Sequence, residues 1–147
     1  MHESVEVQFP SAGAVLPGIL SQAADERGLV VFAHGSGSSR FSTRNQAVAG
    51  RLQADGFSTL LFDLLTPAED TDYAARFDLD LLTRRLVDAT RWASEQTAFV
   101  GAPIGLFGAS TGAAAALRAA VQLEPLVQAV VSRGGRPDLA GAALQRV

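Results

Sequence analysis

The sequence of 147 residues contains no cysteine and no lysine, so all 12 of its basic residues are arginine. Without cysteine the chain can form neither disulfides nor thiolate metal sites, and a cysteine nucleophile is excluded. The absence of lysine excludes a Ser-Lys dyad, a Schiff base and the lysine of a phosphate-binding P-loop. No cluster of metal ligands is visible either, and we therefore expect neither a metal nor an organic cofactor.

Long apolar runs and an excess of positive charge are also missing. No uninterrupted apolar stretch approaches the length of about 18 residues that suggests a membrane span. The N-terminal segment MHESVEVQFPS lacks the basic and apolar regions of a secretory signal, and we predict a cytoplasmic location. The net charge of -3 argues against a nucleic-acid binder. The length and the hydrophobic content of 48% predict a single domain over residues 1–147.

Apolar runs alternate with helical patterns along the chain, and the acidic segment 66–72 is typical of a surface loop. Strands alternating with helices predict an α/β three-layer sandwich, in which a mostly parallel sheet follows an N-terminal antiparallel hairpin. The active site of such a sheet lies at the carboxyl ends of the strands. The predicted elements are a hairpin over 5–9 and 14–20, strands over 29–33, 57–62, 104–107 and 126–131, and helices over 45–54, 77–95 and 111–122.

The pentapeptide GASTG, from Gly108 to Gly112, lies between an apolar run and an alanine-rich helical pattern. G-x-S-x-G between a strand and a helix is typical of the nucleophile elbow of serine hydrolases. We expect both glycines to be required by sterics, because bulkier side chains would collide with the neighbouring strands. The turn should direct the Ser110 hydroxyl into open space, beside the first amides of the following helix.

A second motif, HGSG at residues 34–37, follows the predicted strand at 29–33. Combined with GASTG two strands later, it makes nearly the whole chain resemble an α/β-hydrolase of the dienelactone-hydrolase-like group. The resemblance implies that Ser110 is the nucleophile and that the backbone N–H groups of Thr111 and Ser36, beside Gly35, form the oxyanion hole. It also implies hydrolysis of a small ester, lactone or thioester through an acyl-enzyme, with no cofactor.

The chain departs from this family in its histidines. In the family the acid and the histidine follow the serine, whereas His2 and His34 both precede Ser110. The sequence thus resembles a hydrolase that lacks the C-terminal part carrying the acid and the histidine, and we expect weak activity or none. His34 is either the general base or a brace of the oxyanion loop, with the brace favoured over the base. Asp138 is the candidate acid, although a turn or helix cap is the better interpretation of it.

Four arginines fall in, or just after, the loops at the predicted catalytic edge: Arg40, Arg44, Arg133 and Arg136. They predict a locally positive edge that would suit a carboxylate or phosphate of the substrate. Ordinary solvated arginine is an equal alternative in a chain whose basic residues are all arginine.

Two further functions stay open. The loop GSGSS at 35–39 is typical of a phosphate cradle, but it matches neither G-x-G-x-x-G nor the Walker pattern, which makes a nucleotide-binding module a minor alternative. The stronger alternative is a non-catalytic hydrolase remnant that acts as a binding module or is completed by a partner chain. The predicted strand from Leu126 to Val131 would form a sheet edge without proline or charge, and we predict a homodimer or partner contact there.

Overall fold

The computed structural model describes residues 2–134. The strands are β1 (His2–Ser11), β2 (Ala14–Ala23), β3 (Gly28–Ala33), β4 (Phe57–Phe62), β5 (Ile104–Ala109) and β6 (Val127–Arg133). The helices are α1 (Thr43–Ala54), α2 (Pro67–Asp70), α3 (Leu79–Ser94) and α4 (Thr111–Gln122), with short 3₁₀ turns at η1 (Ala75–Phe77) and η2 (Thr97–Phe99). None of the helices in this part of the chain is long and apolar enough to cross a membrane.

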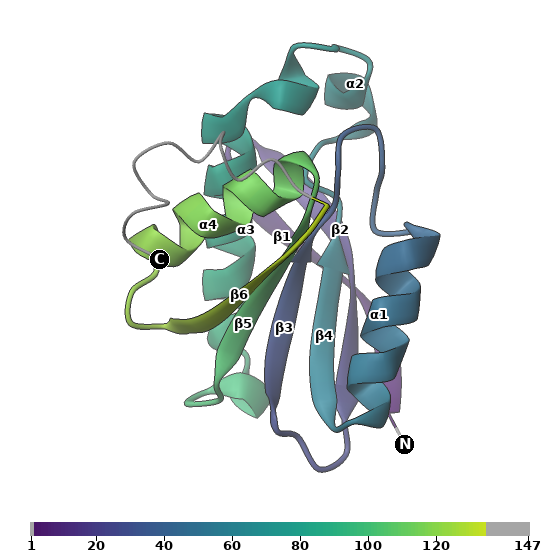
Figure 1. The fold of residues 1–147 in the computed structure, drawn as a ribbon, viewed down its shortest axis with the longest axis vertical. Coiled ribbons are helices and arrows are strands. Elements are labelled where there is room, and N and C mark those ends of the chain that lie inside the picture. The colour runs from purple at the N-terminus through teal and green to yellow at the C-terminus, as the bar shows by residue number, and fades with distance from the viewer. Residues whose placement is uncertain (1, 135–147) are drawn as a thin grey trace.

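The six strands form one sheet in the order β1-β2-β4-β3-β5-β6 (Figure 1). The hairpin β1–β2 joins β4 antiparallel, and β4, β3, β5 and β6 run parallel to their neighbours. This arrangement confirms the predicted fold class. The register pairs Ala33 with Gly108 and Ala109 with Arg133, so that β3, β5 and β6 end at one edge of the sheet.

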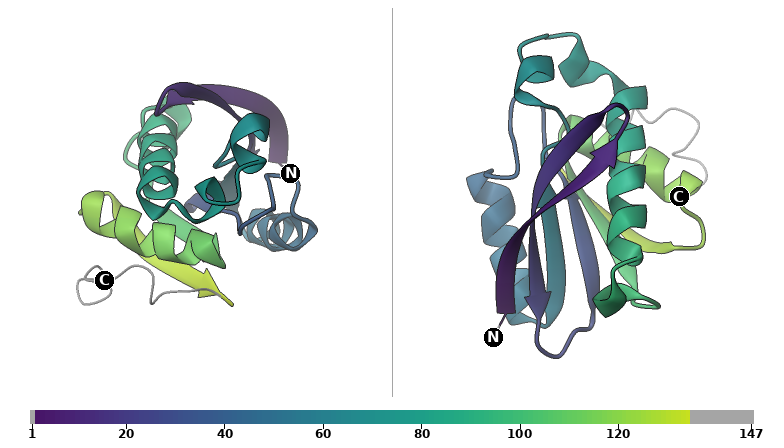
Figure 2. Two further views of the ribbon diagram at one scale, coloured as in Figure 1. Left: turned by 90° about the horizontal axis from the view of Figure 1, so that it is seen from above. Right: turned by 180° about the vertical axis from the view of Figure 1, so that it is seen from behind.

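Helices cover both faces of the sheet, as Figures 1 and 2 show. The helices α3 and α4 pack together on one face, and α1 lies against β4 on the other. The larger core cluster lies beneath α3 and α4, where four of the alanines of α4 let this helix approach the sheet closely. A smaller cluster beneath α1 contains Phe32, Ala49, Leu61 and Phe107. Both faces are therefore buried, as expected for parallel strands.

Several element boundaries differ from the sequence prediction. The segment 66–72 was predicted as a loop but contains α2, which Thr66 and Glu69 stabilise with a capping box. The helix α3 begins at Leu79 rather than at Phe77, because the Asp78 side chain caps it by accepting a hydrogen bond from the Leu81 amide. The last strand runs on to Arg133, which was predicted to lie in the loop beyond it.

Candidate active site

Ser110 occupies the turn between β5 and α4, at φ 57° and ψ -126°. A positive φ is uncommon for a residue with a side chain, and such strained positions gather at functional sites. Among residues 2–134 the Ser110 hydroxyl has no hydrogen-bond partner, and it does not cap its own helix. The elbow thus holds an unbound hydroxyl at the carboxyl edge of the sheet, as its sequence pattern predicts.

The two glycines of the elbow lie where no side chain fits. A Cβ on Gly112 would come within 3.0 Å of the backbone of Ala33 and His34, at the end of β3. A Cβ on Gly108 would come equally close to the backbone of Gly112 and Ala113. The steric requirement for both glycines is confirmed, since it follows from backbone atoms that cannot move aside as a side chain would. The predicted collision with a neighbouring strand holds for Gly112, whereas Gly108 would collide with the start of α4.

The loop after β3 packs directly against Ser110. A Cβ on Gly35 would lie 3.0 Å from the Ser110 Cβ and 3.7 Å from its Oγ. The Ser36 hydroxyl donates to the Arg76 carbonyl at 3.1 Å and lies 3.3 Å from the Thr111 hydroxyl. Thr111 is the first residue of α4, so its N–H has no acceptor within the helix. The predicted oxyanion-hole residues thus lie around Ser110.

His34 is buried, and both of its ring nitrogens have backbone partners. The Leu64 amide donates to Nε2 at 3.0 Å, so Nε2 is the unprotonated nitrogen. The other nitrogen, Nδ1, therefore carries the proton and donates to the Gly35 carbonyl at 2.8 Å. Burial lowers the pKa of His34, and the Gly35 carbonyl and the charge of Asp63 oppose this effect in part. These hydrogen bonds match the brace, and they occupy both nitrogens that a general base could use.

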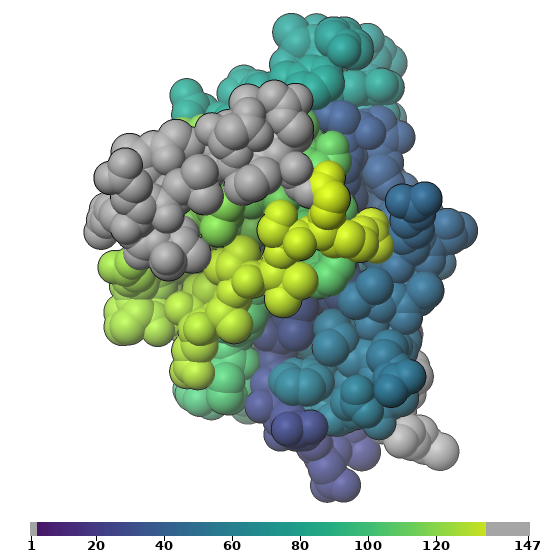
Figure 3. All heavy atoms as spheres, in the orientation of Figure 1, coloured from purple at the N-terminus to yellow at the C-terminus, as the bar shows by residue number. Residues whose placement is uncertain are grey.

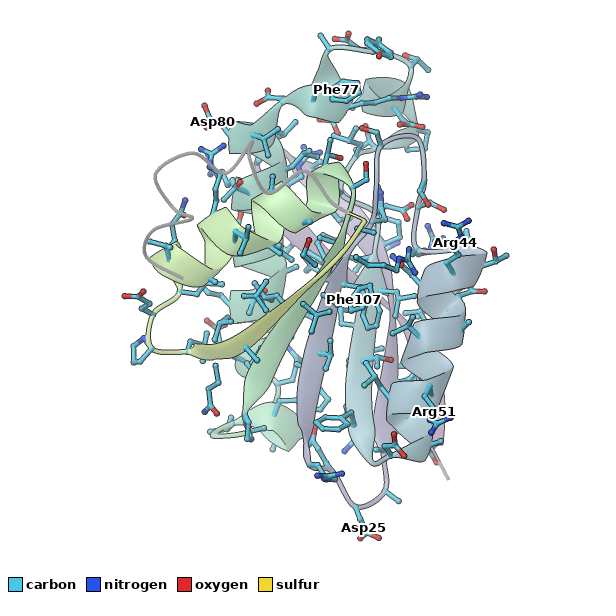
Figure 4. The ribbon with its side chains drawn as sticks, in the orientation of Figure 1. Asp25, Arg44, Arg51, Phe77, Asp80 and Phe107 are labelled. Atoms are coloured by element: carbon cyan, nitrogen blue, oxygen red, sulfur yellow. The ribbon has the colours of Figure 1, made fainter. Side chains whose placement is uncertain are left out.

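The candidate arginines differ in the groups that pair with their positive charges. The Arg40 guanidinium forms an ion pair with the Asp63 carboxylate at 2.6 Å and lies over the Phe41 ring. The backbone N–H of Arg40 donates to the other carboxylate oxygen of Asp63 at 2.7 Å. Asp63, which directly follows β4, thus binds Arg40 of the loop after β3 through both of its carboxylate oxygens. Arg44 is exposed at the start of α1 (Figure 4). Arg136 and Asp138 lie outside the described residues.

Arg133, at the end of β6, contacts neutral groups. Its guanidinium donates to the Asn45 side-chain oxygen at 3.0 Å and lies 5.5 Å from the centre of the Phe107 ring. Within residues 2–134 it forms no ion pair. Arg133 is therefore the candidate arginine that is held in place at this edge without a carboxylate to neutralise it.

The sequence analysis did not identify a charged side chain that is buried near the site. Arg85 of α3 is fully buried and pairs with Glu69 of α2. The signal was present in the sequence, because Arg85 shares the apolar side of its helix with Leu82 and Leu86. A charged residue at such a position needs a buried partner. Within residues 2–134, no group of three or more histidine or acidic side chains could hold a metal ion.

Comparison with known proteins places the chain in a family. A family model described as the alpha/beta hydrolase family matches residues 30–147. Two proteins from Mycobacterium tuberculosis strains (CDC 1551 / Oshkosh and ATCC 25618 / H37Rv), each named "Putative phosphoribosyl transferase", are 54% identical to this chain over 142 residues. The match covers 97% of this chain and 32% of theirs, so the chain spans about a third of their length.

Solved structures agree with the family model. The dienelactone hydrolase of Anabaena variabilis superposes with a TM-score of 0.91 and 47% identity, over 97% of this chain and 68% of that one. An esterase of Pyrococcus furiosus, at 20% identity, superposes with a TM-score of 0.73 over 90% of this chain and 50% of its own, which shows the shared fold. The chain belongs to the α/β-hydrolase family, in its dienelactone-hydrolase-like group.

Proposed function

We propose that this chain is a serine hydrolase-type domain that acts on a small ester, lactone or thioester through a Ser110 acyl-enzyme. The observation that carries the proposal is the elbow: a strained serine with an unbound hydroxyl, between two glycines that cannot accept a Cβ. The likeness to a dienelactone hydrolase at 47% identity supports the same chemistry. In the reaction, the Ser110 Oγ bonds to the substrate carbonyl carbon, the bond from that carbon to the alcohol or thiol group breaks, and the proton of the Ser110 hydroxyl passes to the departing group. Water then hydrolyses the acyl-enzyme, which releases the acid and restores Ser110.

The tetrahedral intermediate of this step carries a negative oxygen. We propose that the backbone N–H groups of Thr111 and Ser36 stabilise this oxygen, and that Gly35 allows the loop to approach Ser110. The contact of Gly35 with Ser110 and the Ser36–Thr111 hydroxyl contact support this assignment. Loss of one such donor typically costs about 3 kcal/mol of transition-state stabilisation.

The general base is the weak part of the proposed site. Nothing in residues 2–134 accepts a hydrogen bond from the Ser110 hydroxyl, and both nitrogens of His34 are engaged by the backbone. We propose that His34 braces the loop and that this 147-residue form turns over slowly. Because no base among residues 2–134 is positioned to activate water, an acyl-enzyme formed from a reactive ester should be long-lived.

For substrate recognition we propose Arg133 over the other arginines. Asn45 and Phe107 orient its guanidinium, and its Cα pairs with that of Ala109, the residue before Ser110. An arginine without a carboxylate partner can bind a carboxylate or phosphate of the substrate through charge-assisted hydrogen bonds. We therefore expect anionic esters to be preferred over neutral ones of the same size. Arg40 is expected to bind an anionic substrate less strongly, because Asp63 already neutralises its charge.

Fluorophosphonate labelling of purified protein tests the proposed nucleophile. We expect the wild type to be labelled on the peptide that contains Ser110, and Ser110→Ala to be unlabelled. Ser132→Ala is a matched control, because Ser132 is an exposed serine of β6 that pairs with Gly108. Equal labelling of wild type and Ser110→Ala would contradict the proposal.

The same reagent separates the two roles of His34. If His34 braces the loop or acts as the general base, the His34→Gln variant should be labelled more slowly than the wild type. Only the role of general base also predicts that the labelling rate of the wild type rises with pH as His34 loses its proton. We expect no such rise, because backbone hydrogen bonds hold both ring nitrogens of His34 and leave neither free to accept a proton from Ser110. A rate that followed the titration of a histidine, and lost this dependence in His34→Gln, would make His34 the base.

A second candidate is a binding module that pairs through β6. This strand forms one edge of the sheet, its Val131 side chain is 53% exposed, and its side chains lie at the surface in Figure 3. We propose that a second copy of the chain or a partner strand pairs there. Light scattering should then show a dimer that Val131→Lys weakens; a monomer at high concentration would contradict this.

The transferase name of the M. tuberculosis proteins is not carried over, since the match covers 32% of their length.

A further inference from the structure

Arg85 lies in the middle of α3 with none of its side chain exposed. Its two terminal nitrogens bind both carboxylate oxygens of Glu69, with Nη2 and Oε2 2.9 Å apart. The same nitrogens also donate to the carbonyl of Leu64 at 3.1 Å and to that of Ala12 at 3.2 Å. One buried side chain thus joins α2, the loop after β4 and the turn of the β1–β2 hairpin.

Stability alone does not account for this ion pair. Buried pairs can often be replaced by apolar residues of similar volume without loss, because desolvation offsets most of the attraction. An apolar residue at position 85 would continue the apolar side of α3 that contains Leu82, Leu86 and Ala89. Moreover, the buried Nε of Arg85 has no partner among the described residues, which adds a further cost. The value of Arg85 therefore lies in the groups that it holds.

One of these groups leads to the candidate active site. The Leu64 carbonyl accepts from Arg85, and the Leu64 amide donates to Nε2 of His34. The opposite nitrogen of His34 donates to the Gly35 carbonyl, and Gly35 packs against Ser110. Each link is a hydrogen bond or close contact between buried or partly buried groups, so a shift of the Leu64 residue would be transmitted to the loop beside Ser110.

Glu69 fixes the other side of Arg85. Its carboxylate accepts from the Thr66 amide at 2.8 Å while its own amide donates to the Thr66 hydroxyl at 3.2 Å. Both Glu69 and Thr66 lie within five residues of Leu64, in the short segment between β4 and α3. The ion pair therefore clamps this segment to α3, at the point where it contacts His34.

We propose that the ion pair between the buried Arg85 and Glu69 is a positioning device that holds Leu64, and through His34 the oxyanion loop, in the conformation that Ser110 needs. The proposal rests on the proposed hydrolase function and assigns Arg85 no contact with the substrate. It predicts that apolar replacement of the pair leaves the fold intact but loosens the loop.

The variants are Arg85→Met, the double variant Arg85→Met/Glu69→Leu and, as a matched control, Arg84→Met. Arg84 is the neighbouring arginine on the same helix, and its side chain is 68% exposed. For each variant, hydrogen exchange of the Leu64 amide and the NMR signals of the His34 ring report on the brace. Fluorophosphonate labelling reports on Ser110, and urea unfolding reports on the fold.

In the double variant we expect cooperative unfolding, exchange of the Leu64 amide about tenfold faster, and an altered His34 ring signal. Labelling should fall by about tenfold to a hundredfold, the effect of a misplaced catalytic group. Arg84→Met should match the wild type in all four measurements. A folded double variant with wild-type Leu64 exchange, or with faster exchange but wild-type labelling, would overturn the proposal. If the wild type itself is not labelled, the hydrolase proposal fails, and Leu64 exchange still shows whether Arg85 holds the loop.

Discussion

Replacing Gly112 with alanine is expected to lower the free energy of unfolding by about 4 kcal/mol or more, into the range reserved for severe backbone and core defects. The added Cβ would lie within 3.0 Å of the backbone of Ala33 and His34, at the end of β3, which is an inner strand of the sheet. To remove this steric clash, α4 would have to move away from β3, and this movement would also displace Ser110. Urea unfolding of the variant measures this loss.

Gly50 supplies the matched control for that substitution. It lies in α1 on the exposed surface, and a Cβ there would meet nothing within 4 Å. Gly50→Ala should therefore stabilise the chain by about 0.5–1 kcal/mol, since alanine is the better helix former. A Gly112→Ala variant that unfolds at the same urea concentration as the wild type would contradict the steric account of the elbow.

Replacing Glu69 with glutamine is expected to cost about 3 kcal/mol at neutral pH. The change keeps the shape of the side chain and suits a capping box, but it leaves the charge of the fully buried Arg85 without a partner. The cost should lie at the lower end for a broken buried pair, because the Glu69 side chain is 31% exposed. Urea unfolding of wild type and Glu69→Gln measures it.

This difference between wild type and Glu69→Gln should depend on pH. The hydrogen bond from Arg85 lowers the pKa of Glu69 from 4.5 to about 2 in the folded chain. Because the folded-state pKa is depressed, the contribution of Glu69 is fully present above pH 4.5 and is lost as the pH falls towards about 2. The two proteins should therefore approach each other in stability within this window. A difference that stays constant down to about pH 2 would contradict the charge-based explanation.

Much of the fold could be predicted because its signals are local. The bounds of β4 follow from the segment FSTLLF between Gly56 and Asp63, and those of α4 follow from a helical pattern that begins at the elbow. The helix α2 was missed although Thr66 and Glu69 have the spacing of a capping box. Its four residues contain no buried side chain, so no apolar periodicity marks it.

The candidate site also has parts that could be predicted from local sequence signals and parts that could not. The sequence motifs identify Ser110 and its neighbouring loop, because each motif is a few consecutive residues with a steric requirement. The role of His34 stayed open because its partner Leu64 is 30 residues away, at the end of a neighbouring strand. The Arg85–Glu69 pair was missed for a similar reason, since only the packing of α3 against α2 and the hairpin turn brings its groups together.

The central claim is that Ser110 is the nucleophile of an acyl-transfer site, and acylation by an activated acetate ester tests it most directly. The chain suits this measurement because it contains neither cysteine nor lysine, the side chains that most often react nonspecifically. Mass spectrometry should find one acetyl group on the peptide that contains Ser110, persisting because deacylation is slow, and none on that peptide in Ser110→Ala. Acetylation that is absent from Ser110, or unchanged in Ser110→Ala, would contradict the account.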